Sequence, residues 1–311
     1  MNAIYQDTLI EKKLANRIFL EKLNECEKFP KYIMIEPIDI CNACCTMCNI
    51  GMHMNDASIL RGGIMTMELF EKIICQIQPY SEWIEMISMY GRGESLLDPN
   101  LELKIKRLKE IGIKKIQLST NASLLSGERI EALFKNGLND LRISIDSVRK
   151  KVFEKIRKGL TFEQVLENTE SAIRIRNEKF PNIPIRIRAV DLPENLDERE
   201  EWLKFWQDRI SDIDTAQFIA YTEKVAGKMG DVTLNWPCIS PFSTLIIRSK
   251  GQINLCCADT IGEMEMGNIL DDSIIRIWQG DKFRTIRRMH LEGIRDKIPM
   301  CRGCSVWRET K

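Results

Sequence analysis

The stretch Cys41-Asn42-Ala43-Cys44-Cys45-Thr46-Met47-Cys48 decides the fold of this chain, because it joins a strand-like run, Tyr32 to Ile38, to a cysteine motif. Three of its cysteines, Cys41, Cys45 and Cys48, have the spacing C-x3-C-x2-C. A [4Fe–4S] cluster has four irons, and cysteine thiolates normally hold all of them. Three thiolates leave one iron open to a small molecule. The stretch therefore predicts a reactive iron–sulfur cluster in the loop after a first strand.

Zinc is the main competing interpretation of these three cysteines. A structural zinc ion takes four ligands, usually from paired C-x2-C units, and Cys44 could supply the fourth. The place of the loop in the chain favours the cluster, because a strand–helix alternation begins there. We expect Cys44 to be a small packing residue inside the loop.

Strands alternate with helices from residue 31 onward. Six βα units of this size predict an α/β fold, in which a parallel sheet covered by helices forms a partial (β/α)6 TIM-type barrel. Active sites of such barrels lie at the C-terminal ends of the strands, and the cysteine loop has that position. The expected strands are 32–38, 84–90, 115–119, 141–145, 184–189 and 216–221, and the expected helices are 66–78, 99–111, 126–136, 161–178 and 196–208.

The segments on either side of the barrel have other patterns. We expect an N-terminal helix within residues 1–30, the barrel over 31–222, a polar linker at 223–235 and a small C-terminal domain over 236–311. That domain opens with a β-hairpin from Thr244 to Cys256, whose turn contains Gly251. Helices are predicted near 272–279 and 281–292.

Composition narrows the class of protein. Lys and Arg total 46 against 45 Asp and Glu, so bulk charge does not indicate a nucleic-acid partner. The chain contains no apolar run of membrane-spanning length and no signal-peptide pattern, so we expect a cytoplasmic protein without a membrane partner. Eleven cysteines in a cytoplasmic chain predict metal centres rather than disulfides. With two histidines, His-based zinc catalysis is not expected.

A second cysteine group predicts a second metal centre. Cys238, Cys256, Cys301 and Cys304 follow the order C…G-x4-C…C-x2-C, and zinc again competes with iron–sulfur for four cysteines. Cys257 is next to Cys256 on a predicted strand, so its side chain points to the opposite face. It is either a buried small residue or a thiol that faces the active site.

Three further motifs follow the strand ends, and with the cysteines they resemble the radical S-adenosyl-L-methionine (SAM) superfamily from about residue 31 to 308. Gly91-Arg92-Gly93-Glu94 resembles the family's G-x-G-E-P, Ser119-Thr120-Asn121-Ala122 its S-T-N-G, and Ile143-Ser144-Ile145-Asp146 its I-S-I-D-G. The second cysteine group resembles the SPASM/Twitch branch with one auxiliary [4Fe–4S] cluster. One departure is Met47, where the family usually has an aromatic residue.

The resemblance implies two [4Fe–4S] clusters and SAM as cofactors. It implies that Cys41, Cys45 and Cys48 hold the first cluster and Cys238, Cys256, Cys301 and Cys304 the auxiliary one. The implied SAM contacts are Gly93, Glu94, Asn121, Ser144 and Arg157. Without the resemblance, the glycine motif would be a tight turn, Ser144 a strand-end cap, and Arg157 a solvated helix charge.

The resemblance also implies the activity. A 5′-deoxyadenosyl radical, made by reductive cleavage of SAM, removes hydrogen from a carbon of a carbohydrate-like small molecule. The main expectation is dehydrogenation of a secondary alcohol, with the auxiliary cluster as electron acceptor and flavodoxin or ferredoxin as low-potential donor. The alternatives are an epimerase with Cys257 as hydrogen donor, a peptide-modifying maturase, which the short segment before the barrel disfavours, and a non-catalytic metal-binding protein.

Substrate contacts are predicted from residues near strand ends. Tyr90, Arg188 and Tyr221 are the candidates beside Cys257. Arg186 and Arg188 alternate with isoleucines on the fifth strand, so one of them faces SAM or substrate, or both belong to a salt-bridged outer face. No residue stands out as the base for alcohol deprotonation.

Overall fold

A computed structural model gives the structure of the chain and describes residues 27–48, 63–219 and 238–304. Three of the sequence predictions lie wholly or mostly outside these residues: the N-terminal helix, the linker at 223–235 and Tyr221. None of the described helices is long and apolar enough to cross a membrane.

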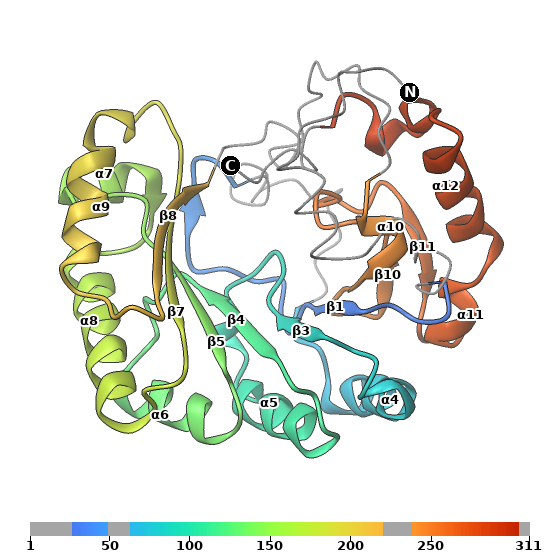
Figure 1. Ribbon diagram of the computed structural model, residues 1–311, viewed down its shortest axis with the longest axis horizontal. Helices are drawn as coiled ribbons and strands as arrows, with labels where there is room; N and C mark the ends of the chain where they lie inside the picture. Colours follow the sequence, from blue (N-terminus) through green and yellow to red (C-terminus); the bar gives the residue numbers. More distant parts are fainter. Residues whose placement is uncertain (1–26, 49–62, 220–237, 305–311) are drawn as a thin grey trace.

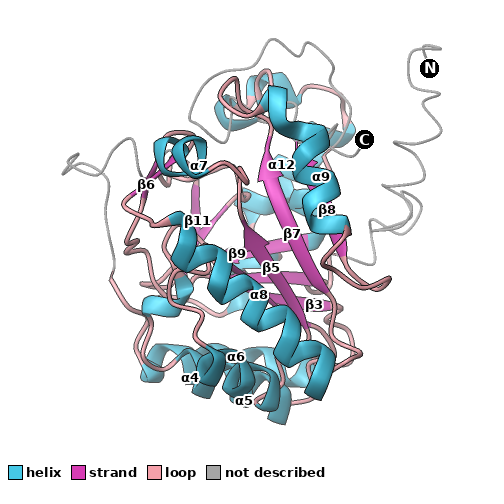
Figure 2. Ribbon diagram, turned by 90° about the vertical axis from the view of Figure 1, so that its left-hand side faces the viewer, coloured by secondary structure: helices cyan, strands magenta, loops and turns pink. Residues whose placement is uncertain are grey.

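Six parallel strands form the barrel part of the sheet, in the spatial order β1-β3-β4-β5-β7-β8. The sheet curves, and its helices lie along the outer, convex side (Figures 1 and 2). The partial α/β barrel expected from the sequence is therefore confirmed. The strands are β1 (Tyr32–Ile35), β3 (Met86–Met89), β4 (Ile116–Thr120), β5 (Asp140–Ser144), β7 (Ile185–Val190) and β8 (Thr215–Ile219).

Two of the helices between these strands begin at residues whose side chains cap them. Thr66 and Ser126 accept hydrogen bonds from the backbone three residues ahead, which starts two helices where the sequence predicted them. One short helix was not predicted, because seven residues are too few for a helical period to show. The helices are α4 (Met67–Ile77), α5 (Leu101–Glu110), α6 (Gly127–Lys135), α7 (Lys150–Ile156), α8 (Phe162–Lys179) and α9 (Arg199–Gln207), with 3₁₀ turns η3 (Gln78–Tyr80), η4 (Ser95–Leu97) and η5 (Leu196–Glu198).

The two faces of the barrel sheet differ in chemistry. Leu118, Ile143 and Ile187 are fully buried in the core that the outer helices cover. Side chains alternate along a strand, so the residues between them point to the inner, concave face. On β5 and β7 the inner face is mostly charged or polar, with Asp140, Arg142 and Ser144 on β5, and Arg186 and Arg188 before Val190 on β7.

The C-terminal segment continues the same sheet rather than forming a separate one. Strand β9 (Thr244–Ile247) pairs in parallel with β1, and β10 (Gln252–Asn254) and β11 (Glu265–Asn268) extend the order antiparallel beyond it. The predicted hairpin is present, with Gly251 at φ +88° in its turn. Strand β11 was not predicted. The domain boundaries expected from the sequence stay predictions.

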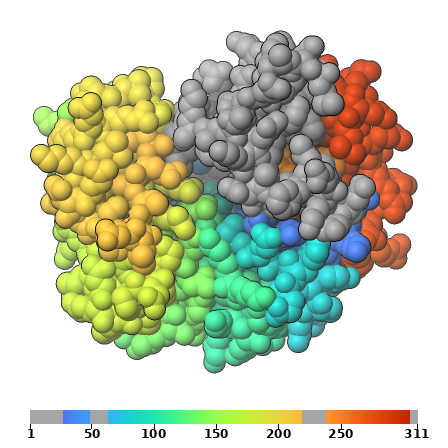
Figure 3. Space-filling view, in the orientation of Figure 1, coloured from blue at the N-terminus to red at the C-terminus, as the bar shows by residue number. Residues whose placement is uncertain are grey.

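Short helices complete the C-terminal segment, which lies at the opposite end of the molecule from α9 and β8 (Figure 3). They are α10 (Ser240–Ser243), α11 (Ile274–Trp278) and α12 (Asp281–Leu291), with 3₁₀ turns η6 (Arg295–Lys297) and η7 (Pro299–Cys301). Two of them correspond to the helices predicted near 272–279 and 281–292.

Candidate active site

The cysteine loop follows β1 and is held by a segment from the far side of the barrel. Within the loop, β2 (Cys44–Cys45) pairs antiparallel with β6 (Arg157–Lys158), and the Thr46 amide donates to the Ile156 carbonyl at 2.9 Å. Gly159 has φ +95°, and a side chain there would lie 3.1 Å from the carbonyl oxygen of Asn42. The chain after α7 is therefore shaped to fit against the cysteine motif.

The three predicted cluster ligands lie close enough to influence one another. Burial raises the pKa of the Cys41 thiol to about 11, and the neighbouring Cys45 and Cys48 raise it as well. Burial also raises the pKa of Cys45, against which Arg157 acts with a guanidinium nitrogen 3.8 Å from the sulfur. Among the described residues, no three Cys, His, Asp or Glu side chains are gathered closely enough for a single metal ion. A cubane spreads its thiolates across its own width, so the donor set fits a cluster.

Gly93 and Glu94 form a turn that presses against the backbone before Cys41. A Cβ on Gly93 would lie 2.5 Å from the carbonyl oxygen of Ile40 and 2.6 Å from that of Ile38, so glycine is required there. The amide of Glu94 donates to the Ile40 carbonyl at 3.0 Å. The tight turn and the family motif are thus one feature, and it sets the position of the cysteine loop.

The Glu94 side chain is buried and has internal partners. Its carboxylate accepts hydrogen bonds from Thr120 Oγ1 at 2.7 Å, the Asn121 amide at 2.8 Å and the Leu96 amide at 3.1 Å. Burial raises its pKa, and these hydrogen bonds act against the rise. The structure therefore shows that Glu94 ties the turn to the end of β4, while its contact with the SAM ammonium stays a prediction.

The end of β4 reaches the cysteine motif through amide side chains. Asn121 donates from Nδ2 to Asn42 Oδ1 at 3.0 Å, and Asn42 donates to Ser123 Oγ at 2.8 Å. Ala122 has φ +60°, which favours glycine, and it stands where the family's S-T-N-G has glycine. Asn42 was not singled out from the sequence, although it lies inside the quoted motif.

Arg157 is buried, so the interpretation of a solvated helix charge is wrong. Its Nε donates to Asp146 Oδ2 at 2.5 Å, and this fully buried carboxylate also accepts from the Val190 amide at 2.9 Å. The carboxylate and the nearby thiols raise the pKa of Arg157 above its usual range. The end of β5 thus holds a fixed cation beside Cys45, and Ser144 lies two residues before Asp146 on the inner face.

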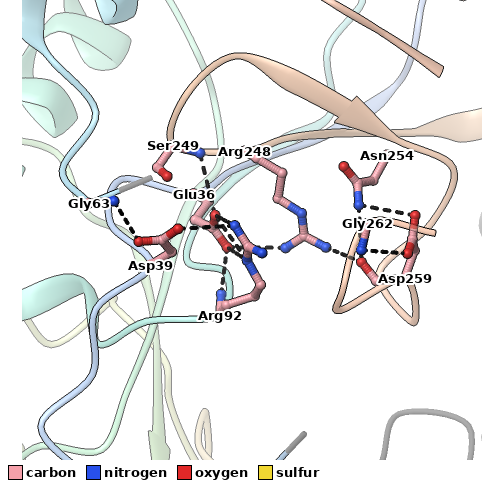
Figure 4. Close-up of polar contacts among 9 residues, drawn as sticks. All are labelled: Glu36, Asp39, Gly63, Arg92, Arg248, Ser249, Asn254, Asp259 and Gly262. Atoms are coloured by element: carbon pink, nitrogen blue, oxygen red, sulfur yellow. Dashed lines mark hydrogen bonds and ion pairs between the residues drawn. The ribbon is translucent and has the colours of Figure 1, made fainter. Parts of the chain in front are cut away.

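A buried ionic cluster behind the cysteine loop was not predicted (Figure 4). Glu36 is fully buried and accepts from the Arg92 amide at 2.7 Å, the Arg92 guanidinium at 3.1 Å and the Arg248 guanidinium at 3.1 Å. Asp39 binds Arg92 at 3.1 Å. Glu36 and Asp39 lie in and just after the predicted first strand, where their burial could not be read from sequence.

Two of the auxiliary cysteines contact a buried histidine. The Cys238 amide donates to His290 Nδ1 at 3.0 Å, and His290 Nε2 lies 3.5 Å from Cys301 Sγ. Burial lowers the pKa of His290 to about 4. The neutral ring accepts at Nδ1, so its proton is at Nε2 and points to Cys301. His290 was missed because histidines were considered only as ligands.

The remaining auxiliary thiols lie within electrostatic reach of these. Burial raises the pKa of Cys256 well above its ordinary value, and Cys238, Cys257 and Cys301 add to the rise. The Cys304 amide donates to the Cys301 carbonyl at 3.3 Å, which closes the C-x2-C turn. Four thiols in one buried region fit a second cluster. Cys257 is exposed, so its interpretation as a buried small residue is wrong.

A cysteine-held centre at the C-terminal end of a barrel strand and a second one on the same sheet define an iron–sulfur enzyme of the barrel class. The sequence pattern of the Radical SAM superfamily matches residues 35–205, more than half of the chain, and that of an iron–sulfur cluster-binding domain, SPASM, matches 238–305. The chain belongs to the radical SAM superfamily. It uses a [4Fe–4S] cluster and SAM, and its SPASM domain binds additional iron–sulfur clusters.

Named relatives agree with this assignment. The chain is 22% identical to the S-adenosyl-L-methionine-dependent 2-deoxy-scyllo-inosamine dehydrogenase of Niallia circulans, over 90% of this chain and 94% of that protein. It is 30% identical to a GTP 3′,8-cyclase of Clostridium perfringens, over 54% and 49%. Among solved structures it resembles BtrN in complex with AdoMet and 2-DOIA, with TM-score 0.58, 20% identity and coverage of 89% and 94%. It also resembles anSMEcpe with bound AdoMet, with TM-score 0.64, 17% identity and 83% coverage of each.

Proposed function

We propose that the enzyme dehydrogenates a secondary alcohol of a sugar- or cyclitol-like small molecule. The observation that carries the proposal is the second thiol group, built into the same sheet as the SAM site, in a chain that aligns along 90% of its length with a SAM-dependent cyclitol dehydrogenase. Oxidation of the alcohol to a ketone removes one hydrogen atom, one proton and one electron. Bound SAM would supply the acceptor of the hydrogen atom, as the source of a 5′-deoxyadenosyl radical, and a base and an electron acceptor would take the proton and the electron.

When bound, the cofactors would supply this chemistry: an electron for the cleavage of SAM at the first cluster, and an acceptor for the second oxidation step at the auxiliary cluster. Cys41, Cys45 and Cys48 would hold the first, and Cys238, Cys256, Cys301 and Cys304 the second. Gly93, Glu94, Asn121, Ser144 and Arg157 would form the SAM pocket. A flavodoxin or ferredoxin would be the donor, and a cytoplasmic location stays a prediction.

The chain's own residues position and protect the reaction. The turn at Gly93 and the amide ladder through Asn42 and Asn121 fix the cysteine loop relative to β4. Arg157, whose guanidinium is oriented by the buried Asp146, is the residue that we propose for the SAM carboxylate. The apolar outer face of the strands and the covering helices exclude water from one side of the sheet. Tyr90 and Arg188 are the proposed substrate contacts.

Epimerisation is the second candidate, and the exposed thiol of Cys257 beside Cys256 favours it. In that reaction Cys257 would give a hydrogen atom to the substrate radical and invert one carbon. Peptide modification stays an alternative, because likeness to the solved structures shows the fold alone.

The test uses reconstituted protein. It should hold about eight iron atoms, two cubanes, and release 5′-deoxyadenosine with SAM and dithionite, whereas Cys45→Ala should release none. With a panel of cyclitols and sugars in D2O, a dehydrogenase yields ketone without deuterium at the oxidised carbon. An epimerase incorporates deuterium there and loses this in Cys257→Ala. Iron near four atoms, or ketone that still forms after the auxiliary cysteines are replaced, would contradict the proposal.

A further inference from the structure

Two arginines on neighbouring strands point to the inner face of the barrel. On β5, Arg142 lies between the fully buried Leu141 and Ile143, and on β7, Arg188 lies between the fully buried Ile187 and Ala189. The strands pair in parallel with Arg142 opposite Arg186 and Ser144 opposite Arg188. Arg142 and Arg188 are therefore diagonal neighbours on one face, and their charges lie close together.

These two cations differ from Arg186, which shares their face. Arg186 Nε donates to Asp140 Oδ1 at 3.0 Å, so its charge is neutralised inside the protein. In the described part of the chain, the side chains of Arg142 and Arg188 make no hydrogen bond or ion pair, and the Nε atom of each is buried without a partner. Buried donors without acceptors cost folding free energy, so they are expected where a ligand supplies the acceptor.

The electrostatics agree with this geometry. Burial and the neighbouring Arg142 lower the pKa of Arg188 to about 10, Arg186 lowers it further, and Tyr90 and Asp140 act in the opposite direction. At neutral pH the group is still protonated. Arg142 and Arg188 therefore hold two positive charges close together at half-buried positions, and one bound anion would reduce the repulsion between them.

A third unpartnered donor continues the line onto the next strand. Gln117 on β4 is fully buried, and its Nε2 has no hydrogen-bond partner among the described residues. Its Oε1 accepts from Ser88 Oγ at 3.3 Å, which leaves the amide N–H groups turned away from that contact. Gln117 is opposite Asp140, two residues before Arg142, so β4, β5 and β7 each contribute one donor.

We propose that Arg142 and Arg188, with Gln117 beside them, bind an anionic group of the substrate, a carboxylate or a phosphate. The inference rests on the proposed function, because it assigns the inner face of the barrel to the substrate of that reaction. Oxygen-rich anions match a row of N–H donors and two guanidinium groups. The enzyme would then act on an acidic sugar or cyclitol, such as a sugar acid or sugar phosphate, and not on a neutral or amino-substituted one.

The level of the arginines favours the substrate over SAM as the source of the anion. Arg157 and Asp146 mark the level of the cysteine loop, and the expected SAM carboxylate lies there. Arg142 lies two residues before the end of β5, about 7 Å deeper than Ser144, whereas Arg188 is level with Ser144. An anion that bridges Arg142 and Arg188 therefore extends from the level of Ser144 toward the interior of the barrel.

The test measures binding to the reconstituted, SAM-loaded enzyme by calorimetry at fixed ionic strength, with inorganic phosphate as probe and glucose as neutral comparison. We expect phosphate to bind the wild type and glucose not to. Arg142→Gln and Arg188→Gln should each weaken phosphate binding about tenfold or more, because each removes a charge-assisted hydrogen bond. Arg188→Lys should keep part of the affinity, since it keeps the charge. The matched control is Arg174→Gln, which removes an exposed arginine on α8 and should leave phosphate affinity unchanged.

The affinity for SAM is measured in the same proteins. No phosphate binding to the wild type, or equal affinity in Arg142→Gln and Arg188→Gln, would overturn the proposal. Parallel losses of SAM and phosphate affinity would also overturn it, by assigning the arginines to the SAM carboxylate. If Arg188→Gln does not fold, Arg188→Lys and Arg142→Gln carry the comparison. These measurements need no turnover, so a failure of the proposed dehydrogenation, seen as absent ketone, is distinguished from a failure of the anion site.

Discussion

Replacing Glu36 by glutamine tests the ionic cluster behind the cysteine loop. Glu36 lies at the end of β1, is fully buried, and accepts hydrogen bonds from both Arg92 and Arg248 (Figure 4). Glutamine keeps the shape of the side chain but removes its charge. Arg92 then retains Asp39 at 3.1 Å, whereas Arg248 retains its hydrogen bond to the carbonyl of Asp259 and, among the described residues, no carboxylate. One guanidinium is left buried without a counter-charge.

The number of guanidinium groups that lose their counter-charge sets the expected loss of unfolding free energy. Removing one partner of a buried ion pair costs about 3–5 kcal/mol, because an uncompensated charge stays in the interior. Since Asp39 still neutralises Arg92, we expect the lower end, about 3 kcal/mol. The double variant Glu36→Gln/Arg248→Gln should lose less than the sum of the two single variants, because the stranded charge is gone.

The assay is anaerobic urea unfolding of the reconstituted enzyme, followed by circular dichroism, with stability taken from the midpoint and slope. The matched control is Glu82→Gln, which removes an exposed glutamate paired with Lys114 and should leave the midpoint almost unchanged. A loss below about 1 kcal/mol in Glu36→Gln, or full additivity in the double variant, would refute the reasoning.

Three further predictions concern the cysteine loop, the end of β4 and the auxiliary site. Gly93→Ala places a Cβ 2.5 Å from the Ile40 carbonyl oxygen, so we expect at least a severalfold fall in SAM cleavage and less iron at the first site. The measurements are 5′-deoxyadenosine released and iron bound per chain. Normal values of both would contradict the close contact of this turn with the backbone before Cys41. Ala122→Gly relieves φ +60° and should raise the unfolding free energy by up to about 1 kcal/mol in the same urea assay, whereas a loss would show that the turn tolerates a Cβ. His290→Phe removes the Nε2 proton directed at Cys301 and should lower the midpoint potential of the auxiliary cluster by about 60 mV, if the hydrogen bond stabilises the reduced form by about 1.4 kcal/mol. Redox titration followed by electron paramagnetic resonance checks this, and an unchanged potential would exclude the bond.

The barrel could be predicted from the sequence because its signals are local. The strands are short segments in which apolar residues recur, such as Ile116 and Leu118 in β4, and two of the helices begin at a capping residue such as Ser126. The pairing of β9 with β1 joins residues more than two hundred positions apart, and no periodicity reports such a contact. The hairpin was therefore expected by itself and not as part of the barrel sheet.

The residues of the candidate site also fall into two groups, those that could be predicted from the sequence and those that could not. Motif residues such as Glu94 and Arg157 could be found because a family pattern gives their positions. The buried partners Asp146, Asn42 and Glu36 depend on which side chains the fold brings within 3 Å or so of one another, and a polar residue in a strand has the same letter whether it is solvated or buried. Arg186 and Arg188 are an example. Arg186 pairs with Asp140, whereas the Nε atom of Arg188 is buried without a partner.

The ionic cluster also bears on how the two thiol groups are held relative to each other. Glu36 lies five residues before Cys41, and it binds Arg248, which donates to the carbonyl of Asp259. Asp259 in turn follows Cys256 by three residues, and its amide donates to the Cys256 carbonyl at 3.1 Å. A continuous polar path therefore joins the two cysteine loops through buried groups. The proposed reaction begins at one centre and ends at the other, so it needs a constant separation between them. Burying these charges costs free energy, but their hydrogen bonds fix that separation more sharply than apolar packing alone would.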